Sequence, residues 1–219
     1  MSSLSCPLCS SLNVQPFHRD PRRDYHQCQD CLLVYVDYQQ HLSPIQEKAI
    51  YDLHQNAIDD PGYIAFLLRL AGPLLERLPN RAEGLDFGCG PGPALAQLFE
   101  AQGHRLNLYD PFYADYPEHL QQTYDYIVCT EVVEHFRLPR REFEALFKLL
   151  KPGGWLGIMT KLVINAEAFA KWHYKNDLTH IAFFSRPTFH WLATHYNCQI
   201  EFIGNDVIIL KRNPSHYTD

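Results

Sequence analysis

Residues 84–92 read Gly-Leu-Asp-Phe-Gly-Cys-Gly-Pro-Gly, which is an apolar strand end followed by three glycines at alternate positions. Gly88, Gly90 and Gly92 let the backbone turn tightly and approach a ligand closely, because glycine tolerates positive φ and carries no Cβ. We expect a helix over residues 93–103, and its N-terminus would point at the same place, where nucleotide-like ligands are commonly held. The stretch therefore predicts a ligand-binding turn between a strand and a helix.

Beyond this turn, predicted strands alternate with predicted helices, which indicates a mostly parallel sheet covered by helices. Strands are expected at residues 84–88, 105–109, 126–130 and 154–160, and helices at 93–103, 139–150 and 186–195. Two further strands, 198–203 and 206–212, flank Gly204-Asn205 and form a hairpin, so the sheet gains an antiparallel edge. Ahead of the glycine turn, 43–57 and 61–78 read as helices. The predicted fold class is α/β, with a Rossmann-like, mostly parallel sheet and an antiparallel C-terminal hairpin.

The acidic-x-Gly-x-Gly-x-Gly form, built here from Asp86 and the three glycines, resembles motif I of the class I S-adenosylmethionine (SAM)-dependent methyltransferases. The resemblance covers about residues 82–212, and Lys151-Pro152-Gly153-Gly154 is similar to the turn that enters the fifth strand in this seven-stranded family. It implies SAM as the cofactor and methyl transfer as the activity. A dinucleotide site is the competing interpretation, but its G-x-G-x-x-G pattern would place the last glycine at Pro93.

The resemblance assigns cofactor residues individually. Those expected at the methionine end of SAM are Asp86, Gly88, Gly90 and Gly92, and Phe87 and Cys89 are assigned to the cofactor site with them. Asp110, at the end of the second strand, is expected to take both ribose hydroxyls, since a carboxylate has two acceptor oxygens. Pro111 would border the adenine, and Thr130 and Glu131 follow the fourth strand at the cofactor crevice. On the helical connector, Tyr63, with His54 and Asn56, is assigned to a lid over SAM.

One region departs from the family pattern. Between Asp110 and Asp125 the family has a third strand, a helix and a residue that contacts the adenine amine, but this chain has too few residues for them. We therefore expect a sheet of six strands, or one very short strand, and assign no adenine-binding residue.

Acceptor-side residues are expected on the loop after the fifth strand, where the run from Trp172 is similar to one in ubiquinone-biosynthesis-type methyltransferases. The substrate-binding candidates are Lys161, Trp172, Tyr174 and Asp177. His180 is the predicted catalytic base, because imidazole titrates near neutral pH. Glu131 and His135 have the i, i+4 spacing of a metal pair, but two ligands without a third are weak support for a metal site. That pair is interpreted as a crevice residue and a helix-start histidine.

Four cysteines near the N-terminus form two Cys-x-x-Cys pairs, Cys6 with Cys9 and Cys28 with Cys31. This spacing is typical of a zinc ribbon, and four thiolates leave no open coordination position, so the predicted Zn²⁺ is structural. Two disulfides, or four unrelated thiols, are the alternative interpretation. The strand-like pieces of the ribbon are 13–17, 25–26 and 32–36.

The chain of 219 residues is long enough for one α/β domain and a small appendage: we expect a zinc ribbon over 1–40, a helical connector over 41–80 and the methyltransferase domain over 81–219. The net charge of −6 and pI of about 6.0 disfavour a protein that binds nucleic acid through charge alone. The chain has no apolar run long enough for a membrane span and no signal pattern at its start, so we expect a cytoplasmic protein.

The predicted acceptor is a small molecule or a carrier-attached metabolite. An RNA acceptor docked by the ribbon is one alternative. A non-catalytic SAM-fold protein that binds a protein partner through the ribbon is another.

Overall fold

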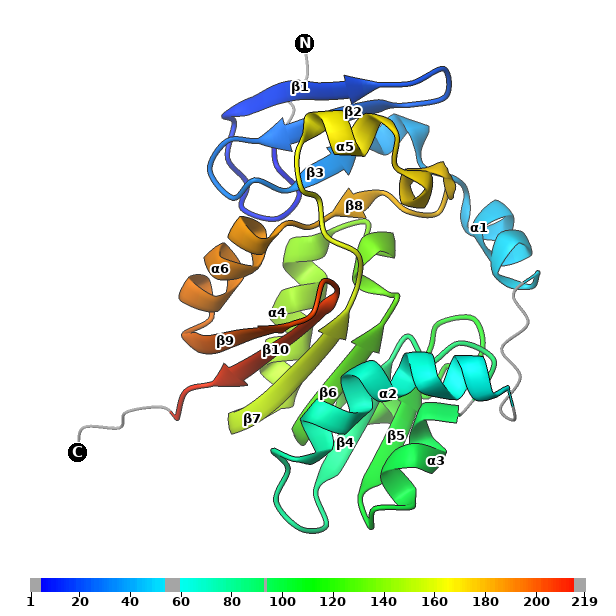
Figure 1. The fold of residues 1–219 in the computed structure, drawn as a ribbon, viewed down its shortest axis with the longest axis vertical. Helices are drawn as coiled ribbons and strands as arrows, with labels where there is room; N and C mark the ends of the chain where they lie inside the picture. Colours follow the sequence, from blue (N-terminus) through cyan, green and yellow to red (C-terminus); the bar gives the residue numbers. More distant parts are fainter. Residues whose placement is uncertain (1–4, 54–59, 93, 215–219) are drawn as a thin grey trace.

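The fold was analysed in a computed structural model that describes residues 5–53, 60–92 and 94–214. Six strands form the central sheet, in the order β5-β4-β6-β7-β10-β9 (Figure 1). Their bounds are β4 Glu83–Phe87, β5 Arg105–Tyr109, β6 Tyr124–Thr130, β7 Leu150–Met159, β9 Cys198–Ile203 and β10 Val207–Arg212. Strands β5, β4, β6 and β7 pair in parallel, whereas β10 pairs antiparallel with β7 and with β9. The predicted fold class, including the C-terminal hairpin, is confirmed.

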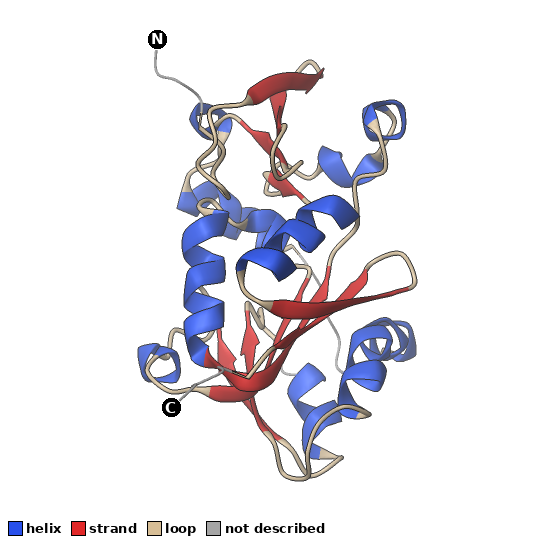
Figure 2. Cartoon of the chain, turned by 90° about the vertical axis from the view of Figure 1, so that its left-hand side faces the viewer, coloured by secondary structure: helices blue, strands red, loops and turns tan. Residues whose placement is uncertain are grey.

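Helices cover both faces of this sheet (Figure 2). Helices α2 (Pro61–Leu75) and α3 (Ala94–Glu100) pack on one face, and α4 (Pro139–Leu149) and α6 (Arg186–His195) on the other. Burial from two sides explains the apolar run in β10: Val207 and Ile209 belong to the core under α2 and α3, while Ile208 and Leu210 belong to the core under α4 and α6.

The sheet has six strands in the described chain, where the family resemblance implied seven. The physical reason lies in the short connection between β5 and β6. It forms a bridge between Asp110 and Ala114 and a 3-10 turn, η2, at Pro117–Leu120. This stretch is too short for a crossover helix and another strand, so the chain passes directly from β5 to β6.

The N-terminal segment forms a second sheet that a distant strand completes. Its order is β1-β2-β3-β8, and all pairs are antiparallel. The first three strands, β1 (Val14–Arg19), β2 (Asp24–Cys28) and β3 (Val34–Val36), lie where the sequence predicts them, but β8 (Ala182–Phe183) comes from beyond β7. The ribbon also shares the core beneath α4, where Leu8 and Leu33 join Phe143. The ribbon and the predicted methyltransferase domain thus share both a sheet and a core.

The remaining elements connect the two sheets. Helix α1 (Pro44–Tyr51) begins with a capping box at Ser43, and the part of its predicted extent from 54 to 57 lies outside the described residues. Short elements η3 (Val133–His135), α5 (Ala166–Ala170) and η4 (His173–Asn176) carry the chain around the crevice, and η1 (Tyr38–Gln40) leads from the ribbon to α1. Strand β7 begins at Leu150, four residues before the predicted start, because Leu150 pairs with Tyr124 across a register shift. Among the described helices, none is long and apolar enough to cross a membrane.

Candidate active site

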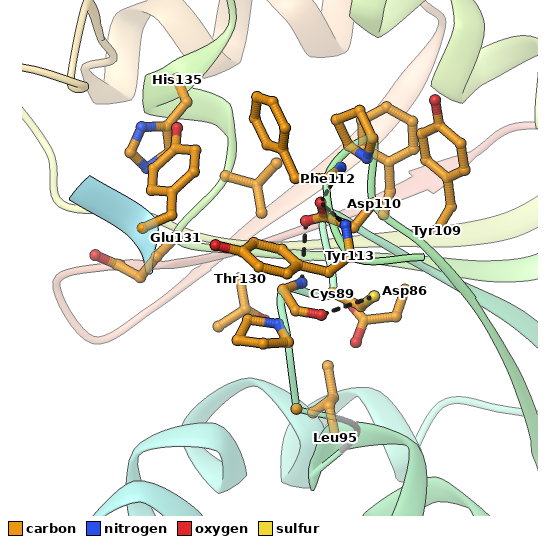
Figure 3. A pocket seen from close by; sticks show the side chains of 18 of the residues that line it. Asp86, Cys89, Leu95, Tyr109, Asp110, Phe112, Tyr113, Thr130, Glu131 and His135 are labelled. Atoms are coloured by element: carbon orange, nitrogen blue, oxygen red, sulfur yellow. Dashed lines mark hydrogen bonds between the residues drawn. The ribbon is translucent and has the colours of Figure 1, made fainter. Parts of the chain in front are cut away.

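A cavity of about 860 Å³ opens at the carboxyl ends of β4, β5 and β6 (Figure 3). This is the edge at which parallel α/β sheets bind ligands, where the strand order reverses, and the volume is within the usual range of small-molecule sites. Every described residue that the sequence assigned to SAM lines it: Tyr63, Asp86, Phe87, Gly88, Cys89, Gly90, Gly92, Asp110, Pro111, Thr130 and Glu131. His54 and Asn56 lie outside the described residues.

The glycine turn forms the floor of the cavity. Gly88 has φ +82°, and a Cβ there would lie 2.6 Å from Val132 Cγ2, so both its conformation and its surroundings require glycine. Gly90 has φ +63°, and a Cβ there would meet open space. The Gly88 N–H donates to the Tyr109 carbonyl (2.7 Å), which joins the turn to the end of β5.

Asp110 connects this turn to the next loop. Its Oδ2 accepts from the Gly90 N–H (3.1 Å), and its Oδ1 accepts from the N–H groups of Phe112 (2.8 Å) and Tyr113 (3.1 Å). A carboxylate has about four lone-pair sites, so one site, on Oδ2, is left for a ligand. Contact with two ribose hydroxyls therefore requires one backbone N–H to be released.

Asp86 is a buried acid beneath the glycine turn, with 4% of its surface exposed. Burial raises its pKa to about 7, and the charge of nearby Asp110 adds to the shift. A cationic ligand group near the turn would favour the ionised form. The α-ammonium of a bound SAM is such a group.

Thr130, at the end of β6, presents an unused polar group. Its buried Oγ1 has no hydrogen-bond partner within the described part of the chain, and the residue lines the cavity. Buried hydroxyls are normally paired, so this atom fits a ligand that supplies the partner. Aromatic side chains from the β5–β6 connection, Tyr109, Phe112 and Tyr113, line the cavity as well. Volume, glycine turn, acids and unpaired hydroxyl together fit a nucleoside-type ligand such as SAM.

Two histidines face the same cavity away from the glycine turn. His180 Nδ1 lies 2.7 Å from the Tyr174 carbonyl, and His135 Nδ1 lies 3.1 Å from the Thr179 carbonyl. Because a carbonyl only accepts, each Nδ1 must carry the proton, and in the neutral ring each Nε2 keeps a lone pair. The ring centroids are 4.8 Å apart, so both imidazoles line the same part of the cavity.

Two glutamates, Glu131 and Glu134, contact the hydroxyl of Tyr174. Glu131 has φ +54°, a strained conformation for a residue with a side chain, and its Oε2 lies 3.1 Å from the Tyr174 hydroxyl. Glu134 is fully buried; it accepts from Thr160 Oγ1 (3.0 Å) and hydrogen-bonds Tyr174. Burial raises the pKa of Glu134 to about 8, and the nearby Glu131 carboxylate adds to the shift.

One donor atom from each of Glu134, His135 and His180 lies within 4.8 Å of the other two. This set of donors can hold a divalent cation. The sequence paired Glu131 with His135 and found no third ligand. In the structure, His135 groups instead with Glu134, its neighbour, and with His180 from the loop after η4, which sequence spacing could not connect.

The predicted acceptor residues divide into two groups. Asp177 and His180 line the cavity, whereas Lys161, Trp172 and Tyr174 are not among the described lining residues. Trp172 packs beside Tyr174 with ring centroids 5.1 Å apart, and Lys161 Nζ lies 3.2 Å from His173 Nε2. Tyr174 contacts His180 through its carbonyl, and it contacts Glu131 and Glu134 through its hydroxyl.

Sequence reasoning missed other residues that line the cavity: Pro44, Glu47, Tyr51, Val132, His135, Phe136, Arg137 and Glu142. Helix α1 brings Glu47 and Tyr51, and Glu47 Oε2 accepts from Arg137 (2.7 Å). The ring of Tyr51 lies 5.3 Å from that of His135. The capping signal at Ser43 predicts a helix but not the face against which it packs.

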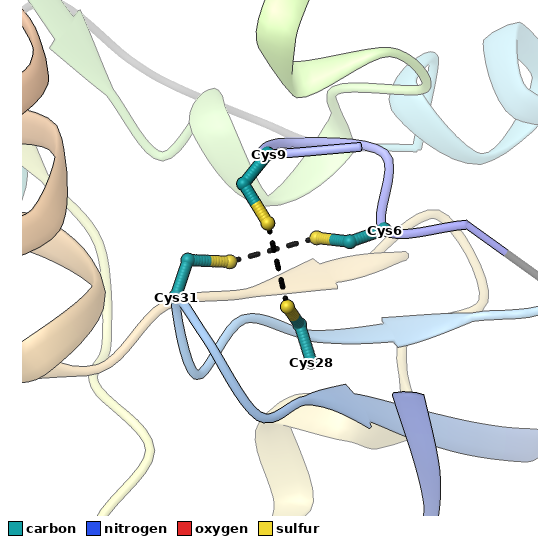
Figure 4. A group of neighbouring side chains, drawn as sticks. All are labelled: Cys6, Cys9, Cys28 and Cys31. Carbon is teal, nitrogen blue, oxygen red and sulfur yellow. Dashed lines mark hydrogen bonds between the residues drawn. The ribbon is translucent and has the colours of Figure 1, made fainter. Parts of the chain in front are cut away.

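The four N-terminal cysteines converge on one point (Figure 4). Each is a free thiol, and their Sγ atoms all lie within 4.8 Å of one another, with Cys6–Cys31 at 3.5 Å and Cys9–Cys28 at 3.4 Å. A tetrahedron with Zn–S bonds of about 2.3 Å has edges of about 3.8 Å. The cluster therefore fits a zinc ribbon.

A family model described as "Methyltransferase domain" matches residues 58–201. The chain belongs to this family, and its fold is that of the class I SAM-dependent methyltransferases. The comparison with curated proteins gave no match.

Solved structures share this fold at low sequence identity. One is the 1,6-didemethyltoxoflavin-N1-methyltransferase of Burkholderia thailandensis with bound 1,6-didemethyltoxoflavin and S-adenosylhomocysteine; it is 16% identical, with 92% of this chain and 100% of that chain covered and a TM-score of 0.54. Another is an O-methyltransferase family protein from Burkholderia thailandensis, which is 17% identical, with 78% of this chain covered and a TM-score of 0.51. The match spans 64% of that protein's length.

Proposed function

We propose that this protein transfers the methyl group of SAM to a nucleophile on a small-molecule or carrier-attached acceptor. One observation carries the proposal: a single cavity joins the glycine turn and Asp110 to the imidazoles of His135 and His180. Bound SAM supplies an electrophilic methyl group on a sulfonium, and methyl transfer then depends mainly on positioning. The chain's own task is to hold both reactants and to receive a proton.

The cofactor end has a defined role for each group. The turn at Gly88 and Gly90 lets the ligand approach the backbone, and Oδ2 of Asp110 offers a lone pair to a ribose hydroxyl. Asp86 supplies a negative charge to a cationic methionine end when it is ionised. Thr130 Oγ1 offers a hydroxyl that has no partner within the described chain.

The acceptor end has a base in His180. Its Nδ1–H donates to the Tyr174 carbonyl, so its Nε2 can accept a proton from a hydroxyl or amine. Asp177 Oδ2 lies 3.9 Å from Nε2 and would stabilise the imidazolium that results. His180 is 8% exposed, so little water competes at this position.

The test is methyl transfer from labelled SAM into the small-molecule fraction of a cell extract, with His180→Gln and Asp110→Ala as variants. We expect labelling by the native protein, loss of turnover with retained SAM affinity in His180→Gln, and weakened SAM affinity in Asp110→Ala. Labelling of the RNA fraction instead would favour the RNA alternative. SAM binding with no labelled fraction would favour the non-catalytic alternative.

We propose, as a second form of the same function, that a divalent cation bound by Glu134, His135 and His180 directs transfer to a hydroxyl acceptor. The grouping of three donors supports this form, as does the proximity of two carboxylates, Glu131 and Glu134, which a cation would neutralise. A cation there would lower the pKa of a bound hydroxyl. In that case His180 serves as a ligand rather than as the base.

Calorimetric titration of Mg²⁺ and Mn²⁺ into zinc-loaded protein distinguishes the two forms. Binding that is lost in Glu134→Gln and kept in Glu142→Gln, an acid on the same cavity, supports the cation. Activity that survives metal-free buffer, with the ribbon zinc intact, supports the base.

The ribbon arginines favour a small acceptor over RNA. Arg23 is buried, and Arg22 donates to the carbonyl and side chain of Asn176 (3.1 and 3.2 Å). Arg19 is exposed but pairs with Asp24 (3.2 Å). Basic groups already engaged within the protein contribute little to phosphate binding. The predictions of an RNA acceptor and of a protein partner for the ribbon stay untested.

A further inference from the structure

The turn between β1 and β2 of the zinc ribbon carries a buried arginine. This arginine contacts residues 174–181, which we call the acceptor loop. Arg23 is 3% exposed. Its guanidinium donates to four backbone carbonyls of one short segment: those of Asp177 (3.0 Å), Leu178 (3.1 Å), His180 (2.9 Å) and Lys175. A guanidinium has five N–H donors in a rigid fork, which a lysine ammonium cannot reproduce.

The segment that these bonds hold also carries the acceptor end of the cavity. Asp177 and His180 line the cavity, and the backbone carbonyl of each accepts a hydrogen bond from Arg23. The side chain of Asp177 faces back into the segment, where its Oδ1 accepts from Thr179 N (2.8 Å) and Oγ1 (2.6 Å). Backbone position therefore sets where the His180 imidazole lies.

Further bonds from the ribbon hold both ends of the segment. Arg22 contacts Asn176 at its beginning. At its end, Val36 N–H donates to the Ile181 carbonyl (2.9 Å), and β3 then pairs with β8. These hydrogen bonds join the ribbon to the segment, and strand β8 lies beside β3 of the ribbon (Figure 1).

We propose that Arg23 is a positioning residue for methyl transfer: the zinc ribbon, through this guanidinium, fixes the loop that places His180 and Asp177 at the acceptor end. The inference rests on the proposed function of the same cavity. The ribbon then has a role in the reaction, because its hydrogen bonds hold the backbone of the acceptor loop in place.

Hydrogen–deuterium exchange on the full, zinc-loaded chain tests the contact, with Arg23→Lys and Arg23→Gln compared with Arg19→Gln on the exposed end of β1. We expect exchange in residues 174–181 to rise about ten- to a hundredfold in both Arg23 variants, as lost hydrogen bonds to a charged group predict. Exchange in 84–100 and zinc content should stay at native values. Unchanged exchange in 174–181, or an equal rise over the whole chain, would overturn the proposal.

A kinetic split separates positioning from a merely structural role. With labelled SAM and the acceptor fraction found above, the Arg23 variants should keep the native KM for SAM and lose turnover by tenfold or more. Free guanidinium at millimolar concentration should restore part of the turnover in Arg23→Ala. Native turnover in Arg23→Lys and Arg23→Gln would overturn the role. A native protein that binds no SAM would overturn the proposed function but leave the exchange result standing.

Discussion

At the scale of single residues, the cofactor end depends on groups whose protonation and contacts are set by burial. Asp110 has three of its lone pairs occupied by backbone N–H groups, and Asp86 is nearly inaccessible to water. A buried polar group that loses its partner costs more than an exposed one. Substitutions here should therefore change both SAM binding and stability.

Asp110→Ala should weaken SAM binding by about 1–3 kcal/mol, because a ribose hydroxyl of the ligand loses its acceptor. Calorimetry measures the affinity. The matched control is Asp115→Ala, an exposed acid on the same connection. Equal affinities in the native protein and Asp110→Ala would remove Asp110 from the site.

Asp86→Asn should stabilise the SAM-free protein in a pH-dependent way. The folded-state pKa of about 7 lies above the unfolded value of about 3.9, so this acid contributes stability at low pH that is lost as pH rises from about 4 to about 7. Asparagine stays neutral, so the gain in Tm of the variant over the native protein should grow across that window and then level off. A difference that does not change with pH would contradict the assignment.

Gly88→Ala should destabilise the fold more than Gly103→Ala. Both glycines have φ near +80°, but a Cβ at Gly88 meets Val132 at 2.6 Å while one at Gly103 meets open space. The control therefore carries only the cost of placing an L-residue at positive φ, about 1–2 kcal/mol. Denaturant unfolding should show a larger loss for Gly88→Ala, part of which the double variant with Val132→Ala recovers. Equal losses would mean that the contact with Val132 is not limiting.

At the scale of elements, the sequence predicts well wherever local pattern decides structure. Burial on two faces makes the strands apolar, and turn residues mark their ends, so β5, β9 and α6 begin and end where predicted. Strand β8 was missed because two residues carry no periodicity, and its partner β3 is far away in the sequence. The grouping of His180 with His135 was missed because the two residues are far apart in the sequence. The acidic and glycine residues that the sequence assigned to SAM line one cavity because one β-α-β step positions them.

The ribbon and β8 share a sheet, so loss of zinc should reach the acceptor loop. Cys9→Ser should lower zinc content and cost at least about 4 kcal/mol of unfolding free energy, as loss of a structural metal does. Metal analysis and hydrogen exchange are the measurements, and exchange should rise in 174–183 but not in 84–100. Cys198→Ser, at a half-buried thiol outside the ribbon, is the control. Native zinc content in Cys9→Ser would contradict the four-cysteine site.

At the scale of the whole molecule, two sheets meet around one cavity. The six-stranded sheet supplies the cofactor end at the carboxyl edges of β4, β5 and β6, and the ribbon sheet supports the loop at the acceptor end. Helix α1 adds a wall through Glu47 and Tyr51. A shared core under α4 joins the ribbon to the main sheet.

The central claim is that this cavity binds SAM. Calorimetric titration of the purified, zinc-loaded protein with SAM, S-adenosylhomocysteine and NAD tests it most directly. The account predicts binding of the first two, weakened in Asp110→Ala, and no binding of NAD. A folded protein that binds NAD, or that binds neither SAM nor S-adenosylhomocysteine, would contradict it.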